Sequence, residues 1–165
     1  MALFKPKKTF FRVTDITPEY LDSIGVKALA LDADNTLSTH HSQIPLDGVT
    51  DWMQSMRNAG IKLIMVSNAK RQRVKPFAEG LGLDYICLAC KPLPSGFIRA
   101  CKKLGLKRKQ LAAVGDQLFT DMLGANTAGV VSLLVTPIEA EDGWSFHVRR
   151  RLERPLLRRY KKRGL

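Results

Sequence analysis

The sequence has few cysteines and no long apolar run, and each shortage argues against a class of protein. Three of its 165 residues are cysteine, an odd number in a chain long enough to bury a core without cross-links. A disulfide scaffold is therefore disfavoured and a reducing compartment is expected. No apolar stretch approaches the roughly 20 residues needed to cross a bilayer. Residues 1–12 lack an apolar segment followed by a small-residue cleavage site, so we predict a cytoplasmic protein.

The three cysteines are predicted to be buried structural thiols. Cys87 and Cys90 form one CxxC pair, and the chain contains no second pair. Residues three apart in an extended segment point to opposite faces, which disfavours a zinc or redox site there. Cys101 stands alone and is expected to pack in the core.

Acidic residues are also scarce relative to basic ones. Lys and Arg total 27 against 15 Asp and Glu, a formal net charge of +12, and residues 146–165 contain nine of the basic residues and one Glu. Apolar residues recur there at every fourth position: Val148, Leu152, Leu156 and Tyr160. We predict a basic amphipathic tail, interrupted at Pro155, that suits an anionic bilayer surface, nucleic acid or an acidic protein. Packing on the domain with a solvated charged face is the alternative.

A regular alternation of β-rich apolar runs and amphipathic segments is present. Five runs, nearly continuous in Val, Ile, Leu and Ala, are typical of strands covered on both faces: 26–31, 61–66, 85–89, 111–114 and 131–135. Segments of helical length lie between them: 46–59, 71–81, 94–104 and 119–128. This order predicts an α/β fold with a doubly wound, mainly parallel, five-stranded sheet. Residues 1–145 are expected to form one domain with a basic N-terminal arm, and 146–165 its tail.

Polar residues gather where the predicted strands end. Four of the five strands are followed by such residues: Asp32, Asp34 and Thr36, then Ser67 and Asn68, then Lys91, then Asp116 with Asp121. Ligands of doubly wound sheets bind beyond the carboxyl ends of the strands. The sequence therefore predicts a site at this edge.

The charges of these residues indicate the chemistry of that site. Asp32 and Asp34 project to the same side of an extended chain, and two carboxylates about 4 Å apart repel by about 4 kcal/mol at an effective dielectric near 20. A cation must compensate, and four hard carboxylates with no Cys or His cluster suit Mg²⁺. With Lys91 and the Ser67 hydroxyl added, the set suits a phosphoryl group.

In order and strand context, four motifs resemble those of the haloacid dehalogenase (HAD) phosphatases: Asp32-Ala33-Asp34-Asn35-Thr36, hydrophobic-Ser67-Asn68, Lys91 and Gly115-Asp116-x-x-x-x-Asp121. The DADNTL form, the segment 17–21 and the arginine-rich tail are most similar to the YqeG-like branch of subfamily IIIA. That branch is similar to the phosphatases that convert phosphatidylglycerophosphate to phosphatidylglycerol. The resemblance covers about 15–165 and implies a HAD-like Rossmannoid fold.

The resemblance also implies roles for these residues. Asp32 would be the nucleophile that forms an aspartyl-phosphate, and Asp34 the general acid and then the base. Mg²⁺ would be held by the Asp32 carboxylate, the Asp34 main-chain carbonyl, Asp116 and, directly or through water, Asp121. Substrate phosphoryl oxygens would be bound by Ser67, the main chain at Asn68, and Lys91. Thr36 would fix the turn after the first strand.

The spacing of the motifs leaves no room for a cap domain. About 30 residues separate Thr36 from Ser67, and about 22 separate Asn68 from Lys91. HAD enzymes that act on small metabolites usually carry a cap in one of these intervals. An open site suits a phosphate carried on something large, such as a lipid, a protein or a nucleic-acid end.

Three functions remain open on the sequence alone. The leading hypothesis is a Mg²⁺-dependent phosphomonoesterase acting on phosphatidylglycerophosphate, peripheral on the inner face of the membrane. A second is a phosphatase of another large phosphate monoester, either a nucleic-acid end or a phosphoprotein. The third is a non-catalytic nucleic-acid or ribosome-binding module, which the absence of aromatic stacking platforms and recognised nucleic-acid motifs disfavours.

Overall fold

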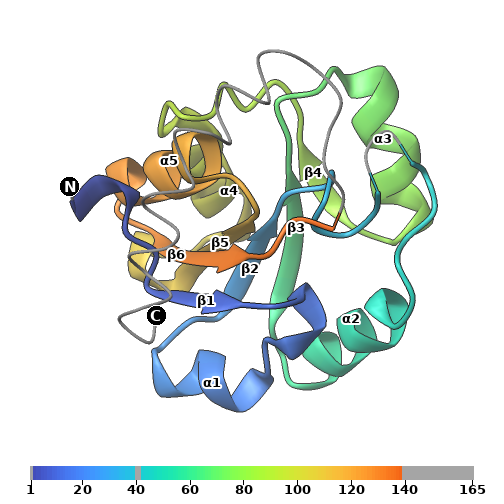
Figure 1. Cartoon of the computed structure of the whole chain (residues 1–165), viewed down its shortest axis with the longest axis horizontal. Coiled ribbons are helices and arrows are strands. Elements are labelled where there is room, and N and C mark those ends of the chain that lie inside the picture. The colour runs from blue at the N-terminus through green and yellow to red at the C-terminus, as the bar shows by residue number, and fades with distance from the viewer. Residues whose placement is uncertain (1, 40–41, 139–165) are drawn as a thin grey trace.

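Six parallel strands form the centre of the molecule (Figure 1). The computed structural model describes residues 2–39 and 42–138. The predicted domain boundary at 145 and the basic tail over 146–165 lie outside the described residues. In chain order the strands are β1 (Lys8–Phe10), β2 (Ala28–Leu31), β3 (Lys62–Val66), β4 (Asp84–Ile86), β5 (Leu111–Gly115) and β6 (Val131–Val135). Their spatial order is β1-β6-β5-β2-β3-β4, which confirms the predicted doubly wound α/β architecture.

The sheet has one strand more than the five predicted. β1 lies in the basic N-terminal arm and pairs in parallel with β6, with Lys8 opposite Leu133 and Phe10 opposite Val135. An edge strand of this kind is held by backbone hydrogen bonds to its single neighbour and needs no continuous apolar run. The three residues of β1 contain none. Apolar periodicity therefore gave no signal for it.

Helices connect the strands on both faces of the sheet. They are α1 (Pro18–Ser23), α2 (Val49–Asn58), α3 (Arg71–Gly80), α4 (Ser95–Leu104) and α5 (Leu123–Ala128), with 3₁₀ turns η1 (Ala2–Phe4), η2 (Val13–Asp15) and η3 (Arg108–Gln110). The predicted helices over 71–81 and 94–104 match α3 and α4 to within one residue, whereas the other two differ more. α2 begins three residues later than expected, after Gly48 at φ 80°, and the predicted helix over 119–128 is divided into a π-helical turn, η4 (Leu118–Met122), and α5.

The helix ends follow their local sequence. Thr17 caps α1 by accepting a hydrogen bond from the Tyr20 N–H at 3.2 Å, with Pro18 in the first turn. The four glycines expected after helices have φ between 61° and 78°: Gly60, Gly82, Gly105 and Gly129. At Gly105 the chain reverses so that the Leu106 N–H reaches the Cys101 carbonyl at 3.0 Å.

Alternate residues of the central strands face two different core layers. In β2, Leu29 and Leu31 pack with the residues of α2 and α3, whereas Ala28 and Ala30 face the layer that contains α4 and α5. The small alanines allow these two helices to approach the sheet closely. Burial on both faces is what a parallel sheet requires, and it explains the continuous apolar runs in the sequence.

The prediction that all three cysteines are buried is confirmed for Cys101 and wrong for Cys87 and Cys90. Cys101 is buried, Cys87 is half-buried and Cys90 is exposed, and all three are free thiols. The physical reason is that β4 ends at Ile86, so Cys87 and Cys90 lie in the connection to α4 rather than within a covered strand.

The connections that leave the strands are short in the described chain. β3 is joined to α3 by four residues, 67–70, and β4 to α4 by eight, 87–94. The described part of the connection from β2 to α2 forms a small loop in which Ser38 bridges Pro45, with no inserted domain. Within the described ranges, no helix has the length and apolar character to span a membrane.

Candidate active site

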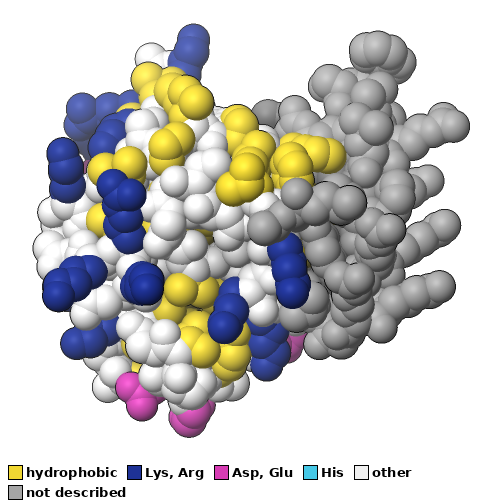
Figure 2. Space-filling model, turned by 90° about the vertical axis from the view of Figure 1, so that its left-hand side faces the viewer, with side chains coloured by type: hydrophobic (Ala, Val, Ile, Leu, Met, Phe, Trp, Pro, Cys, Tyr) yellow, Lys and Arg dark blue, Asp and Glu magenta, His cyan; other side chains and the backbone are white. Residues whose placement is uncertain are grey.

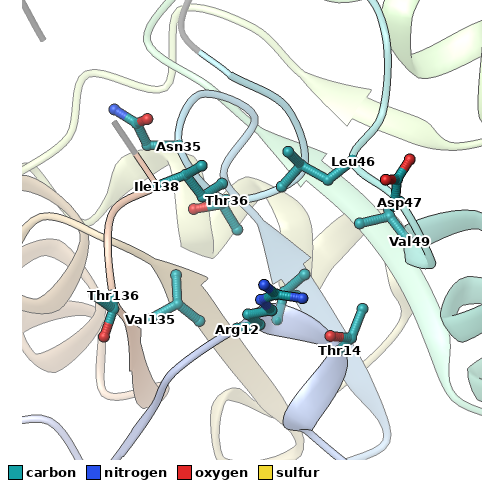
Figure 3. A pocket seen from close by; sticks show the side chains of 11 residues that line it. Arg12, Thr14, Asn35, Thr36, Leu46, Asp47, Val49, Val135, Thr136 and Ile138 are labelled. Atoms are coloured by element: carbon teal, nitrogen blue, oxygen red, sulfur yellow. The ribbon is translucent and has the colours of Figure 1, made fainter. Parts of the chain in front are cut away.

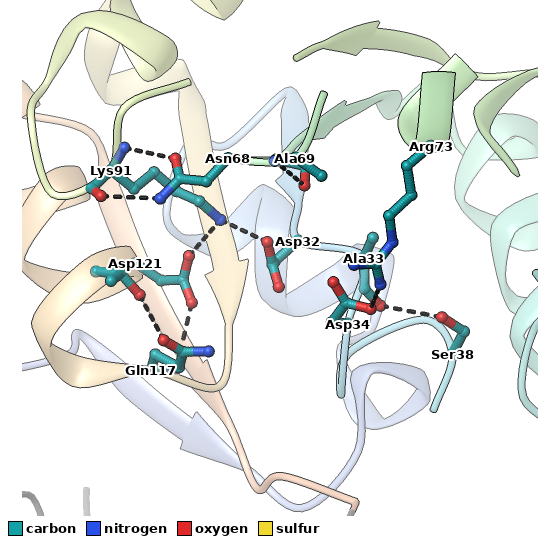
Figure 4. Close-up of polar contacts among 12 residues, drawn as sticks. Asp32, Ala33, Asp34, Ser38, Asn68, Ala69, Arg73, Lys91, Gln117 and Asp121 are labelled. Atoms are coloured by element: carbon teal, nitrogen blue, oxygen red, sulfur yellow. Dashed lines mark hydrogen bonds and ion pairs between the residues drawn. The ribbon is translucent and has the colours of Figure 1, made fainter. Parts of the chain in front are cut away.

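The carboxyl ends of β2, β3, β4 and β5 bring the predicted polar residues to one edge of the sheet (Figure 4). Asp32 directly follows β2, and its backbone N–H donates a hydrogen bond to the Val114 carbonyl of β5 at 2.9 Å. This bond extends the ladder one residue beyond the strand. It holds Asp32 between the end of its own strand and the end of β5, where Asp116 follows.

Three carboxylates converge at this edge. Asp32, Asp116 and Asp121 each place an oxygen within 4.8 Å of those of the other two. Asp116 and Asp121 are almost completely buried and Asp32 is half-buried. Buried charges of one sign require a counter-charge, and three carboxylates suit a hard divalent cation such as Mg²⁺. The donor set therefore fits the expected metal.

Lys91 is the positive partner of this cluster. Its Nζ lies 2.5 Å from Asp32 Oδ1 and 2.6 Å from Asp121 Oδ1, and only 4% of its side chain is exposed. Burial disfavours the ammonium, but the charges and hydrogen bonds of Asp121 and Asp32 outweigh that effect and raise the pKa of Lys91 above its ordinary value. Lys91 is therefore a fixed cation at any physiological pH.

One lysine does not neutralise all the carboxylates around it. Burial raises the pKa of Asp32 to about 7, an effect that Lys91 opposes and that the charges of Asp121 and Asp34 reinforce. The ionised form of Asp32 thus needs positive charge in addition to Lys91. A metal cation at the carboxylate cluster would supply it.

Asn68 holds the backbone of Lys91 from both sides. Its Oδ1 accepts a hydrogen bond from the Lys91 N–H at 2.7 Å, and its Nδ2 donates to the Lys91 carbonyl at 2.9 Å. The sequence predicted only a main-chain role for Asn68 in binding phosphate. The structure adds a side-chain role, which is to aim Lys91 at the carboxylates (Figure 4).

Ser67 directly follows β3, at the same edge of the sheet. Its side chain is buried, and its Oγ accepts a hydrogen bond from the Ala69 N–H at 3.2 Å. The Ser67 backbone joins two segments, because its N–H donates to Ile86 and its carbonyl accepts from Ala89. The structure thus gives Ser67 a turn-forming hydrogen bond, while its predicted contact with a phosphoryl oxygen stays a prediction.

Asp34 faces a different partner from Asp32. Its carboxylate forms an ion pair with Arg73 of α3 and does not belong to the group of three clustered carboxylates (Figure 4). Any metal ligand from Asp34 would therefore be its main-chain carbonyl, as the family resemblance implies. The contact of Arg73 with Asp34 could not be predicted from the sequence. Four basic residues lie over 70–75, and the pattern does not indicate which of them faces the site.

Gly115 makes room for Asp121. A Cβ added at Gly115 would lie 2.4 Å from both Cγ and Oδ2 of Asp121, closer than any real contact. Asp121 also accepts a hydrogen bond from the Gln117 N–H at 3.2 Å. The Gly-Asp-x-x-x-x-Asp spacing therefore has a steric reason, because the second carboxylate folds back against the glycine.

The expectation that Thr36 fixes the turn after β2 is not supported. Its hydroxyl is buried and forms no hydrogen bond to a described residue. Thr36 instead lines a cavity of about 180 Å³ beside the loop that carries Asp34 (Figure 3). The cavity lies between η2, α2 and the end of β6, and its lining includes neither Lys91 nor any of the four acidic site residues.

Comparison with known proteins agrees with this geometry. Residues 20–129 match the family model described as haloacid dehalogenase-like hydrolase. The chain belongs to the haloacid dehalogenase-like hydrolases. It is 37% identical to the probable phosphatase YqeG of Bacillus subtilis over 161 residues, which covers 98% of this chain and 94% of that protein. The resemblance to the YqeG-like branch is thereby confirmed, and this hydrolase is a phosphatase of the HAD family.

Two further relatives of this hydrolase bear on its fold and on its substrate. It is 27% identical to phosphatidylglycerophosphate phosphatase 1 of Arabidopsis thaliana over 158 residues, which covers 89% of this chain and 45% of that protein. The hydrolase thus spans about half the length of the plant protein. A cobalt-bound phosphatase of Haemophilus influenzae that acts on deoxy-D-mannose-octulosonate 8-phosphate superposes with a TM-score of 0.52, at 16% identity, over 67% of this chain and 68% of that one. This likeness shows the shared fold.

Proposed function

We propose that this hydrolase is a Mg²⁺-dependent phosphomonoesterase that works through an aspartyl-phosphate and removes the terminal phosphate of phosphatidylglycerophosphate. The observation that carries the proposal is the contact of Lys91 with Asp32 and Asp121, beside Asp116, at the open carboxyl edge of the sheet. This arrangement offers an acidic nucleophile and a fixed cation next to a position where a metal fits.

In the first step, the Asp32 carboxylate attacks phosphorus and displaces the alcohol. One P–O bond forms to Asp32, the bond to the leaving oxygen breaks, and Asp34 donates a proton to that oxygen. Lys91 stabilises the negative charge on the phosphoryl oxygens. Because Arg73 pairs with Asp34 in the structure, this ion pair must open before Asp34 can donate a proton.

In the second step, water attacks the phosphorus of the aspartyl-phosphate. Asp34 accepts a proton from the water, the acyl phosphate bond breaks, and the products are inorganic phosphate and the regenerated Asp32 carboxylate. Asp32, Asp116, Asp121 and the Asp34 main-chain carbonyl would hold Mg²⁺. Mg²⁺ would neutralise charge on the phosphoryl group and on Asp32.

The lipid substrate is supported by two observations. The described connections form no cap over the site, so a phosphate monoester that projects from a bilayer can reach Asp32 without leaving its membrane. The Arabidopsis relative, which aligns with most of this chain, is named for phosphatidylglycerophosphate. A large substrate with an exposed terminal phosphate suits such an edge.

The experiment that tests the proposal measures phosphate release from phosphatidylglycerophosphate in mixed micelles, with and without Mg²⁺. Wild type is expected to turn over the lipid only with Mg²⁺, and Asp32→Asn is expected to be inactive. Asp34→Asn is expected to be strongly impaired, because the first step loses its general acid and the second step loses its base.

The alternative substrates are tested in the same assay. An oligonucleotide 3′-phosphate and a phosphopeptide are compared with the lipid at equal concentration. Protein that hydrolyses an aryl phosphate but not the lipid would reject the lipid assignment. Faster turnover of either soluble substrate would favour the corresponding alternative, and function that survives Asp32→Asn would indicate a binding module.

A further inference from the structure

The exposed large apolar side chains of the described chain are unevenly distributed. Five of the six lie in connections that leave the ends of strands, at the same edge of the sheet as the site: Phe11, Ile44, Leu88, Leu93 and Ile138, exposed by 69%, 75%, 55%, 61% and 43%. We call these five residues the apolar rim. The sixth is Leu3 in η1. Single exposed apolar residues are common on proteins, so the informative observation is their concentration around one functional edge.

The topology explains why these residues share an edge. All six strands are parallel, so every segment that leaves a strand does so on the same side of the sheet. Phe11 directly follows β1, and Ile138 lies three residues beyond β6. Leu88 and Leu93 flank Lys91 in the connection from β4 to α4. The apolar rim therefore lies at the same edge of the sheet as the site.

Basic side chains accompany the apolar rim. Arg12 is exposed next to Phe11, with its guanidinium 5.7 Å from the Phe11 ring centroid. Lys70 and Arg71 are exposed where β3 leads into α3. The described connections of this edge contain two exposed acidic residues, Asp15 and Asp47, and two exposed basic ones, so their exposed charge is balanced overall and basic only locally, beside Phe11 and at the start of α3. Apolar tips with neighbouring Lys and Arg are the composition that binds an anionic lipid surface.

We infer that the carboxyl edge of the sheet is a membrane-docking surface, which inserts the apolar rim between lipid headgroups and places the site directly on the bilayer. The inference rests on the proposed lipid substrate and adds the orientation of the enzyme toward it. The rim residues project from four separate connections, which suits a fluid surface that adapts to each tip. A nucleic acid suits this surface less well, because four of the five rim side chains are aliphatic and cannot stack on bases as aromatic rings do.

The test compares full-length variants in flotation with vesicles made of equal parts phosphatidylglycerol and phosphatidylcholine. The double variant Phe11→Ser/Ile44→Ser removes two rim side chains that lie outside the catalytic and phosphate-binding groups, and it is expected to bind at least about tenfold more weakly than wild type. The matched control is Leu3→Ser, which removes a comparably exposed apolar side chain from η1 and is expected to bind like wild type. Lys70→Ser/Arg71→Ser is expected to weaken binding by about fivefold per residue at low salt.

Enzyme assays separate docking from catalysis. For the rim variant, we expect unchanged hydrolysis of an aryl phosphate and of water-soluble short-chain phosphatidylglycerophosphate, with hydrolysis of the vesicle-embedded lipid reduced about tenfold in line with binding. Unchanged hydrolysis of the soluble substrates also shows that the variant is folded.

Two results would overturn the docking surface. One is wild type that does not float with the vesicles, and the other is a rim variant that floats as well as Leu3→Ser, which would assign membrane binding to residues outside the apolar rim. Neither result contradicts the proposed function if short-chain phosphatidylglycerophosphate is hydrolysed. Failure of wild type to hydrolyse that soluble lipid would instead reject the proposed function, whatever the vesicle result.

Discussion

The two edges of the sheet use charged residues in opposite ways. At the carboxyl edge, Lys91 is buried against Asp32 and Asp121, and these charges act on one another at close range. At the amino edge, basic residues are exposed to water where strands begin and helices end: Lys27, Lys62, Lys102, Lys103, Lys107, Arg108 and Lys109. Figure 2 views the side of the molecule on which the N-terminus lies in Figure 1, and there Lys and Arg side chains far outnumber Asp and Glu.

The difference shows that burial, rather than the kind of side chain, decides what a charge does. Lys103 pairs with Asp84 at 2.7 Å, but both side chains are substantially exposed, so the pair is solvated and contributes little to stability. Lys62 donates to the Leu104 carbonyl at the end of α4, a modest structural contact. Lys91 has the same chemistry as these lysines, yet in a dry environment it opposes the rise that burial causes in the pKa of Asp32, and it cannot be removed without leaving buried carboxylates uncompensated.

The largest contrast between the edges is expected for Asp32→Asn against Asp84→Asn. Loss of the nucleophile should reduce kcat by at least about 10³-fold, whereas removing the exposed carboxylate of the amino edge should leave kcat unchanged. Phosphate release is measured for both variants, with circular dichroism to verify the fold. Comparable activity in the two variants would contradict the assignment of Asp32.

A comparison of Lys91→Met with Lys62→Met tests the difference between a buried lysine and an exposed one. Lys91→Met should lower the free energy of unfolding by about 3–5 kcal/mol and the activity by about 10²-fold or more, because Asp32 and Asp121 lose their partner. Lys62→Met should change the free energy of unfolding by no more than about 0.5 kcal/mol. Urea denaturation measures the free energy of unfolding of both variants. Equal values would show that the buried ion pairs of Lys91 do not contribute to stability.

Gly115→Ala against Gly80→Ala tests the steric fit at the carboxyl edge. The new methyl group at 115 must displace Asp121, which should cost about 1–3 kcal/mol of stability and at least about tenfold in activity. Gly80 lies in α3 with nothing within 4 Å of an added Cβ, so Ala there should preserve activity and raise stability slightly. Full activity in Gly115→Ala would mean that Asp121 need not lie against the strand.

The pH dependence of stability should report the raised pKa of Asp32 in metal-free protein. Because the folded protein retains a proton on Asp32 up to about pH 7 and the unfolded chain loses it near its ordinary value of about 4, the free energy of unfolding should fall as pH rises through this window. We expect a loss of order 1 kcal/mol, measured by urea denaturation at pH 5 and pH 8.

Two controls sharpen this smallest prediction. Asp32→Asn has no such proton to lose and should show a smaller difference between the two pH values, whereas Asp84→Asn should behave like wild type. Added Mg²⁺ should stabilise wild type more at pH 8 than at pH 5, because the metal competes with the proton for Asp32. A metal effect independent of pH would indicate that Asp32 is not a ligand.

Local pattern was enough to predict the parallel sheet and the position of its acidic residues. Continuous apolar runs indicate strands buried on both faces, and the residues next to the carboxyl ends of parallel strands meet at one edge. Asp32, Lys91 and Asp116 could therefore be placed together from their order in the chain, and the structure does bring them together. β1 was not predicted, because this edge strand of three residues has no such run.

Partners that lie far apart in the chain were beyond the reach of local pattern. Arg73 meets Asp34 across 39 residues, and the Asn68 side chain holds the Lys91 backbone across 23. Which basic residue of α3 faces the loop depends on the rotation of that helix against the sheet. Whether Cys90 is covered depends on where β4 ends. Neither is encoded by residue spacing alone.

The sequence by itself determined the fold class, the edge that carries the site and the chemical types assembled there, because these depend on apolar periodicity and on the shared direction of parallel strands. Only the tertiary structure decided which charges touch, which are buried and where the exposed apolar side chains gather. Those properties depend on distances between segments remote in the chain, and the energy of a charge depends on the solvent that packing removes from around it.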